Sequence, residues 1–127
     1  MQSKISQNKK GYHDLLVWQK SKELIKLVYE ITSNFPVSEL YCLTSQIRRA
    51  VISVALNIVE GDRRRSRKEF LRFLDIADAS LAELEACFEL ALVLEFISQK
   101  GYDLFEEKRK ELAVMLVAFI KAIKKCV

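Results

Sequence analysis

The sequence has little proline, glycine, histidine or cysteine, and each shortage excludes a class of protein. One proline and three glycines in 127 residues are too few for an all-β protein, which needs a turn every ~8–12 residues. They are also too few for a collagen-like or low-complexity chain. Hydrophobic residues make up 50% of the chain, which is too many for a disordered protein. We therefore expect one compact and nearly all-helical domain.

Motifs for catalysis and metal binding are also missing. The three cysteines are odd in number and form no Cys-x-x-Cys or Cys/His cluster, so neither a disulfide framework nor a zinc site is predicted. His13 is the only histidine, and the sequence has no glycine-rich phosphate loop. Glu85 and Glu89 lie four residues apart, but without a Glu-x-x-His motif they predict a solvated helix face. We therefore expect no enzymatic activity, and no metal, cofactor or small-molecule substrate.

Long hydrophobic runs are absent as well. The longest, Leu112–Ile120, has nine residues and is too short to span a bilayer. Met1–Lys10 is polar and lacks the apolar segment of a secretory signal. These two observations predict a cytoplasmic protein without a membrane partner.

The sequence does contain strong helical periodicity. Apolar residues recur every three or four positions in four segments, over about 14–34, 44–60, 66–95 and from 98 onward. The first segment ends at Phe35-Pro36, because the residue before a proline disfavours the helical conformation. Four amphipathic helices with short connectors predict an all-α fold, an antiparallel up-and-down four-helix bundle. We assign residues 12–127 to this single domain and residues 1–11 to a flexible polar tail.

The sequence also indicates where these helices begin and end. Asp14 is a candidate N-cap for the first helix and Ser98 for the fourth. Ser66 and Glu69 have the spacing of a capping box, which predicts the start of the third helix. Gly61 follows the last apolar residue of the second helix, where a left-handed C-terminal cap favours glycine.

The second predicted helix is apolar on two sides. One stripe, with Ile47 and Val54, is expected to face the core, and a second stripe comprises Ile52, Leu56 and Val59. Because a helix in a four-helix bundle buries one side, the second stripe needs another partner. A second copy of the protein is the simplest one, although the connector 37–43 could cover the stripe instead. Further candidates for such a surface are Trp18, Tyr29, Val114 and Val117.

Asn57 is a polar residue within this apolar helix. It forms a small polar strip with Ser53 and Glu60, three or four residues away. We interpret Asn57 as part of a hydrogen bond to another helix or another subunit. The alternative is a partly exposed polar position beside the core.

Charge is segregated along the chain. Residues 48–72 hold eight basic and three acidic residues, a net charge of +5, whereas residues 73–111 have a net charge of −6. The basic residues could neutralise phosphates and release counterions, which predicts salt-dependent binding of nucleic acid. Pairing with acidic neighbours, in this chain or another subunit, is the alternative. The candidate phosphate contacts are Arg48, Arg49, Arg63, Arg64, Arg65, Arg67, Lys68 and Arg72.

Several ordered blocks resemble one known family. Tyr12–Lys20 (YHDLLVWQK) is similar to its F/Y-x-D-L-x-V-W-Q-K opening, and Ser53–Gly61 (SVALNIVEG) to its S-I-P-A-N-I-A-E-G signature. Further similar blocks are Phe35-Pro36, Leu43–Ala50 (LTSQIRRA), Arg64–Leu74 (RRSRKEFLRFL) and Ser80–Glu85 (SLAELE). On these blocks, over about residues 12–98, the chain resembles the bacterial proteins encoded in intervening sequences of 23S rRNA genes.

The resemblance implies a small four-helix bundle that forms a ring-like homo-oligomer, typically a pentamer, with no established enzymatic activity. It also implies RNA as a partner or, as an alternative, a scaffold role such as an accessory subunit that docks a reverse transcriptase. A gene within an rRNA insertion does not by itself make rRNA the ligand. The chain departs from the signature at Ala55, where the family has proline, and at Leu56 and Val59, where it has smaller residues. These changes predict a straighter second helix with a larger apolar surface.

Overall fold

The computed structural model describes residues 11–125, which form four long α-helices and two short 3-10 turns. The first turn, Gly11–Asp14, precedes α1, Leu16–Thr32; the second turn, Val37–Glu39, lies between α1 and α2. Helix α2 spans Leu43–Asp62, α3 spans Arg67–Val93 and α4 spans Gln99–Lys125. The predicted all-α four-helix fold is therefore confirmed. The predicted tail lies outside the described residues, except for Gly11, which belongs to the first 3-10 turn.

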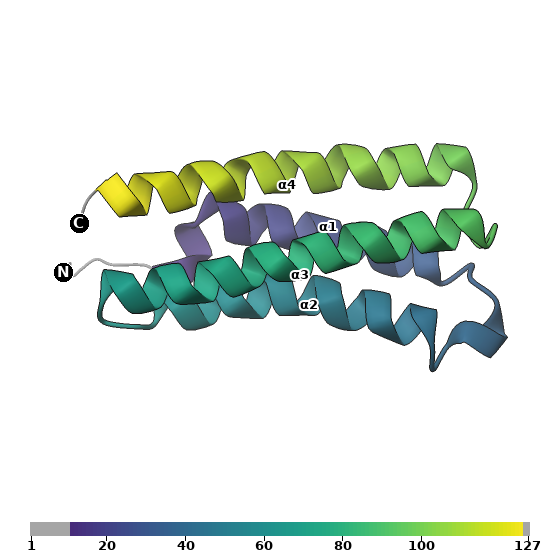
Figure 1. The fold of residues 1–127 in the computed structure, drawn as a ribbon, viewed down its shortest axis with the longest axis horizontal. Helices are drawn as coiled ribbons and strands as arrows, with labels where there is room; N and C mark the ends of the chain where they lie inside the picture. Colours follow the sequence, from purple (N-terminus) through teal and green to yellow (C-terminus); the bar gives the residue numbers. More distant parts are fainter. Residues whose placement is uncertain (1–10, 126–127) are drawn as a thin grey trace.

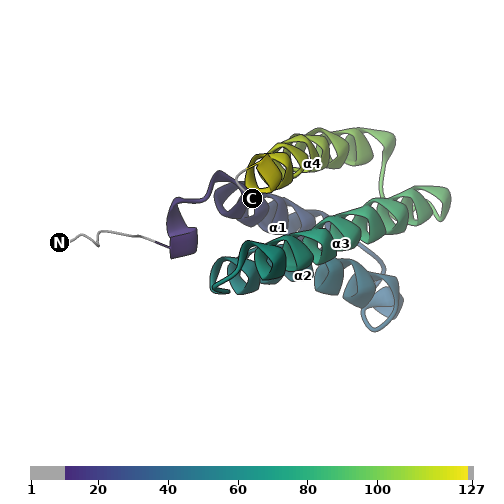
Figure 2. The same cartoon turned by 60° about the vertical axis from the view of Figure 1, so that its left-hand side comes forward.

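Successive helices run in opposite directions along the long axis of the bundle (Figure 1). The α2–α3 turn, the start of α1 and the end of α4 therefore lie together at one end of the molecule. Each helix contacts two neighbours, since α1 packs against α2 and α4, and α3 packs against the same two. Figure 2 shows that the first 3-10 turn lies beside the end where α2 meets α3, and this turn contacts α2.

The core runs along the centre of the bundle, and every helix contributes one buried stripe to it. Towards the end opposite the α2–α3 turn it is aromatic: the rings of Phe88 and Phe105 stack with centroids 3.7 Å apart, and Phe35 packs edge-on against Phe88 at 6.5 Å. Elsewhere it is aliphatic. Fully buried members are Leu24, Val28, Ile47, Val51, Val54, Ile58, Leu74, Leu84, Leu112 and Leu116. Helix α2 is continuous through Ala55, which is buried.

Two of the predicted N-caps are confirmed and one is wrong. The Ser66 hydroxyl accepts a hydrogen bond from the Glu69 backbone N–H at 3.1 Å, and the Ser98 hydroxyl accepts one from the Gly101 N–H at 3.1 Å. Asp14 does not cap α1, because it belongs to the first 3-10 turn and Leu15 precedes the helix. The Leu15 N–H donates to the Tyr12 carbonyl, which closes that turn immediately before α1 begins.

Gly61 is not the left-handed cap that its position predicts. It lies inside α2, is buried, and does not have a positive φ. A Cβ atom at this position would come within 2.8 Å of Phe70 Cδ1 and 3.0 Å of Phe73 Cβ. Glycine is therefore needed here because α2 and α3 approach each other closely, rather than because of backbone conformation.

Candidate nucleic-acid interface

Most of the predicted phosphate contacts gather at the end of the bundle where α2 turns into α3. Residues 63–66 form the turn, and the first two turns of α3 follow it directly. Six cationic side chains lie here, and all six residues are exposed. We refer to them as the basic end: Arg63, Arg64, Arg65, Arg67, Lys68 and Arg72.

Two members of the basic end are held in place by neighbours. The Arg64 guanidinium lies 4.6 Å above the ring of Phe73 and 3.0 Å from the Glu60 carboxylate. The Arg72 guanidinium also lies 4.6 Å from the same ring, and 3.5 Å from the Glu69 carboxylate. Cation–π contacts of this kind fix the position of a guanidinium while leaving its edge able to donate hydrogen bonds.

Three further members, Arg63, Arg65 and Lys68, have no carboxylate neighbour in the part of the chain that the structure describes. Within residues 11–125, no carboxylate lies within 4.0 Å of Arg63, Arg65 or Lys68. An arginine without a carboxylate partner keeps its full set of N–H donors, which match two phosphate oxygens at once. These three residues therefore supply most of the uncompensated positive charge of the basic end.

Arg48 and Arg49 do not belong to this cluster. They lie about 22 Å back along α2, at 1.5 Å per residue, nearer the opposite end of the bundle. The Arg48 Nε–H donates to the Thr32 hydroxyl at 3.0 Å and its guanidinium lies 4.6 Å from the Tyr29 ring. Arg49 donates to the Ser45 hydroxyl at 3.2 Å. The structure thus divides the eight predicted contacts into two separate groups.

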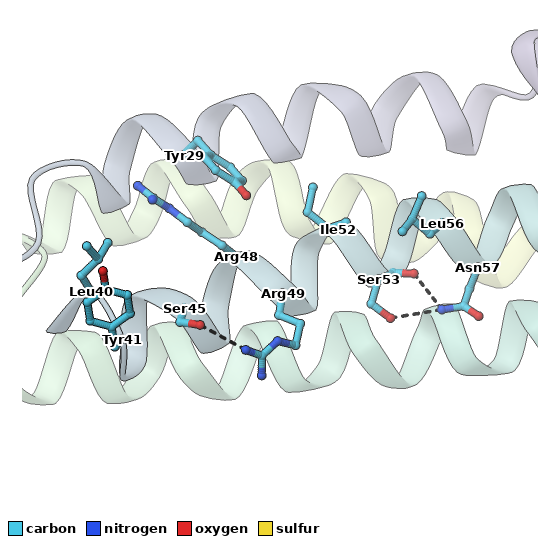
Figure 3. Close-up of a pocket in the computed structure, with 10 residues that line it drawn as sticks. All are labelled: Tyr29, Leu40, Tyr41, Ser45, Arg48, Arg49, Ile52, Ser53, Leu56 and Asn57. Atoms are coloured by element: carbon cyan, nitrogen blue, oxygen red, sulfur yellow. Dashed lines mark hydrogen bonds between the residues drawn. The ribbon is translucent and has the colours of Figure 1, made fainter.

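Arg48 and Arg49 instead line an apolar groove between α1 and α2 (Figure 3). Tyr29 contributes from α1, Ile52 and Leu56 contribute from α2, and the connector supplies Leu40 and Tyr41. We call this the α1–α2 groove. Leu56 remains 56% exposed and Tyr41 90% exposed, so the connector extends the groove and does not cover Leu56.

The residues predicted for self-association are only partly brought together. Ile52 and Leu56 line the α1–α2 groove, whereas Val59 is half-buried outside its lining. Asn57 lies at the rim, and its side-chain N–H group donates to the Ser53 carbonyl at 2.9 Å and to the Ser53 hydroxyl at 3.1 Å. The Ser53 hydroxyl in turn lies 2.9 Å from that of Ser80 on α3. The hydrogen bond between helices is therefore made by Ser53, with Asn57 bonded to it from the same helix.

An open hollow lies beside the basic end, and the sequence alone did not predict it. It is lined by Gly11, Tyr12 and His13 from the first 3-10 turn, and by Asp62 and residues 63–65 from the end of α2 and the turn after it. About fifty residues separate the two segments in the sequence. Only the fold brings them together, so no local pattern could have indicated the hollow.

The sequence profile of the 23S rRNA-intervening sequence protein family matches residues 13–118 of this chain. The chain belongs to this family. The match includes the whole basic end and the α1–α2 groove, so both surfaces are built from the family's own domain. The predicted resemblance is therefore confirmed.

A crystal structure of an S23 ribosomal protein family member from Bacteroides thetaiotaomicron, a protein of unknown function, has a similar fold. The two chains are 28% identical with a TM-score of 0.75, and the match covers 84% of this chain and 99% of the other. Among curated proteins, none shows significant similarity to this member of the intervening-sequence family.

A buried ion cluster between α3 and α4 is a second feature that the sequence did not predict. Arg109 is only 9% exposed, and its guanidinium donates twice to the Glu106 carboxylate at 2.9 Å. It also lies 3.2 Å from Glu85, for which the sequence predicts a solvated face. The hydrogen bonds to Glu106 raise the pKa of Arg109. The spacing of Glu106 and Arg109 could have indicated their pairing, but the contact with α3 depends on the fold.

None of the helices between residues 11 and 125 is long and apolar enough to cross a membrane. Over the same residues, no group of three or more His, Cys, Asp or Glu side chains is arranged to hold a metal ion. Cys87 is buried, and this burial raises the pKa of its thiol, whereas Cys42 is exposed. Cys126 lies outside the described residues.

Proposed function

We propose that this protein binds RNA through the basic end, without catalysing a reaction. The observation that carries the proposal is the exposed positive charge of Arg63, Arg65 and Lys68, at the α2–α3 turn and the start of α3, with no carboxylate of residues 11–125 within 4.0 Å. Arg64 and Arg72 add two guanidiniums that Phe73 holds in fixed positions. An exposed array of cations is suited to the phosphates of a nucleic acid backbone, and such contacts do not depend on base sequence.

The decisive measurement is the salt dependence of binding. Fluorescence anisotropy of a labelled structured RNA, over a series of salt concentrations, gives the number of phosphate charges neutralised. Replacing Arg63, Arg65 and Lys68 by alanine should weaken binding and reduce the slope of log K against log salt by about 2–3. Replacing Lys26, Lys100 and Lys110, which are exposed on other parts of the bundle, removes the same charge and should leave the slope nearly unchanged. Salt-independent binding, or none at low salt, would contradict the proposal.

We also propose that copies of this protein assemble through the α1–α2 groove. Leu56 and Tyr41 are exposed in the lining of the α1–α2 groove, and an exposed apolar surface of this kind is unusual on a monomeric protein. The expected ring is a homo-oligomer, with a pentamer as the form that the family resemblance implies. An aspartate at Leu56 would be buried without a partner in the interface, so Leu56→Asp should dissociate the assembly.

Light scattering during size-exclusion chromatography measures this assembly directly. The Leu56→Asp variant should elute as a monomer with unchanged helical content, whereas Leu104→Asp, at an exposed leucine of α4, should leave the oligomer intact. A wild-type monomer at micromolar concentration would contradict assembly while leaving RNA binding untouched. Capture of a reverse transcriptase from the native host would favour the scaffold role.

A further inference from the structure

The hollow beside the basic end contains aromatic side chains as well as arginines. Tyr12 and His13 stack with ring centroids 4.1 Å apart and planes inclined by 26°. The rings of Tyr12 and Trp18 form a T-shaped contact with centroids 4.9 Å apart, which connects this pair to α1. The sequence around Arg63 contains no such aromatic pair, and the fold supplies it from the chain's first 3-10 turn.

His13 is the outermost ring of this stack. Tyr12 is half-buried between Trp18 and His13, whereas His13 is exposed. The turn is fixed from α1, because the Gln19 side-chain N–H donates to the His13 carbonyl at 3.2 Å. A flat aromatic surface that is held in place and open to solvent is the platform on which an unpaired base stacks, whatever its sequence.

The charges around the hollow are arranged for a nucleotide. Arg63 and Arg65 line it and have no carboxylate within 4.0 Å among residues 11–125. Asp62 contributes the only carboxylate in this lining, and it lies near Gly11, since a Cβ atom added to Gly11 would be 3.8 Å from Asp62 Oδ2. A carboxylate repels phosphate but accepts hydrogen bonds from the N–H groups of a base. The arginines therefore suit the phosphates, and Asp62 and His13 suit the base.

We propose that this hollow binds an unpaired nucleotide of a single-stranded nucleic acid, with the base on His13 and the flanking phosphates on Arg63 and Arg65. The inference rests on the proposed RNA binding and specifies its substrate class. A duplex hides both faces of each base within its stack, so it can engage the arginines but not the aromatic platform. The protein should consequently bind single strands more tightly than duplexes of the same length.

The experiment compares three labelled probes with the 127-residue chain: a single-stranded RNA of about twelve nucleotides, the matching DNA strand, and the RNA duplex. Wild-type protein should bind the single strands about tenfold more tightly than the duplex. His13→Ala should remove most of this preference without changing the salt slope, and His13→Phe should retain it. Arg63→Ala with Arg65→Ala should weaken binding of all three probes and lower the slope by about 2. Comparing the RNA strand with the DNA strand distinguishes the two sources of unpaired bases.

Trp18 provides an independent readout, since it is the only tryptophan and its ring contacts Tyr12. Single strands should change its fluorescence, whereas inorganic phosphate should not. Equal affinity for single strands and duplex, or an unchanged His13→Ala variant, would overturn this inference while leaving RNA binding by the basic end intact. Failure of all three probes to bind would overturn the proposed function as well.

Discussion

Arg109 and Arg63 are the same residue type in opposite surroundings. Arg109 is buried between α3 and α4 and faces two carboxylates, those of Glu106 and Glu85. Arg63 is exposed on the α2–α3 turn, and no carboxylate of residues 11–125 lies within 4.0 Å of it. An arginine does not lose its proton in a protein, so the two side chains carry the same charge and differ only in what neutralises it.

The comparison shows that a count of basic residues does not locate a binding surface. Arg109 already directs its donors to neighbouring carboxylates, and it stabilises the contact between two helices. Arg63 contributes nothing comparable to the fold, and its donors are available to an anion from solution. Arg48 and Arg64 are intermediate cases, since each has an aromatic ring and one polar partner.

The largest effect on the free energy of unfolding is expected at Arg109. Arg109→Met would leave the Glu106 side chain, which is 13% exposed, without a cation, and should lower the free energy of unfolding by about 3 kcal/mol. Urea denaturation followed by circular dichroism measures this difference. Adding Glu106→Leu to the same variant should recover most of the loss, because no buried charge then remains unpaired. If the Arg109→Met variant is as stable as wild type, Arg109 contributes no more to the fold than Arg63 does, and the comparison fails.

A smaller effect on the free energy of unfolding is expected at Arg48. Arg48→Ala removes the hydrogen bond to Thr32 and the contact with the Tyr29 ring, which should cost about 1 kcal/mol of stability. For RNA binding by this variant, the slope of log K against log salt should equal that of wild type, because Arg48 lies far from the basic end. A reduced slope in this variant would show that the nucleic acid extends along α2, and that both arginine groups bind it.

The smallest effect on stability is expected at Arg64. Arg64→Ala loses the exposed contact with Phe73 and an exposed ion pair with Glu60, together about 0.5 kcal/mol. Arg64→Ala should also weaken RNA binding, whereas Arg64→Lys should retain most of the affinity because it keeps the charge. Thermal melting and anisotropy on the same samples separate the two effects. If Arg64→Ala binds RNA as tightly as wild type, Arg64 does not contact the RNA and, like Arg109, serves only the fold.

The helices were predictable from the sequence because their apolar periodicity is strong and their connectors are short. Ser66 and Ser98 were predictable because a capping serine acts within its own turn. Asp14 was not, because the chain forms a 3-10 turn before α1 and Asp14 belongs to that turn, and Gly61 was not, because its role depends on contacts outside the local sequence. For Gly61 the deciding contacts are with Phe70 and Phe73, which a pattern of helix termination does not include.

In the candidate site, too, some features follow from the local sequence and others depend on the fold. The run 63–68 is contiguous, so its concentration of charge is visible in the sequence. Tyr12 and His13 join it only because α1 begins at the same end of the bundle, and the separation of Arg48 from Arg63 follows from the length of a straight helix. Sequence patterns therefore identified the chemistry of the surface, while its boundaries required the fold.

Gly61 has a consequence for genetic screens. It contacts no ligand in either proposal, yet it sets the spacing of α2 and α3 directly before Arg63 leaves the helix. A larger side chain there would push the two helices apart and displace the arginines together, even in a protein that still folds. In a random mutagenesis screen for lost RNA binding, substitutions at Gly61 should therefore be recovered alongside those of the arginines, although an alanine scan of exposed residues would never test this position.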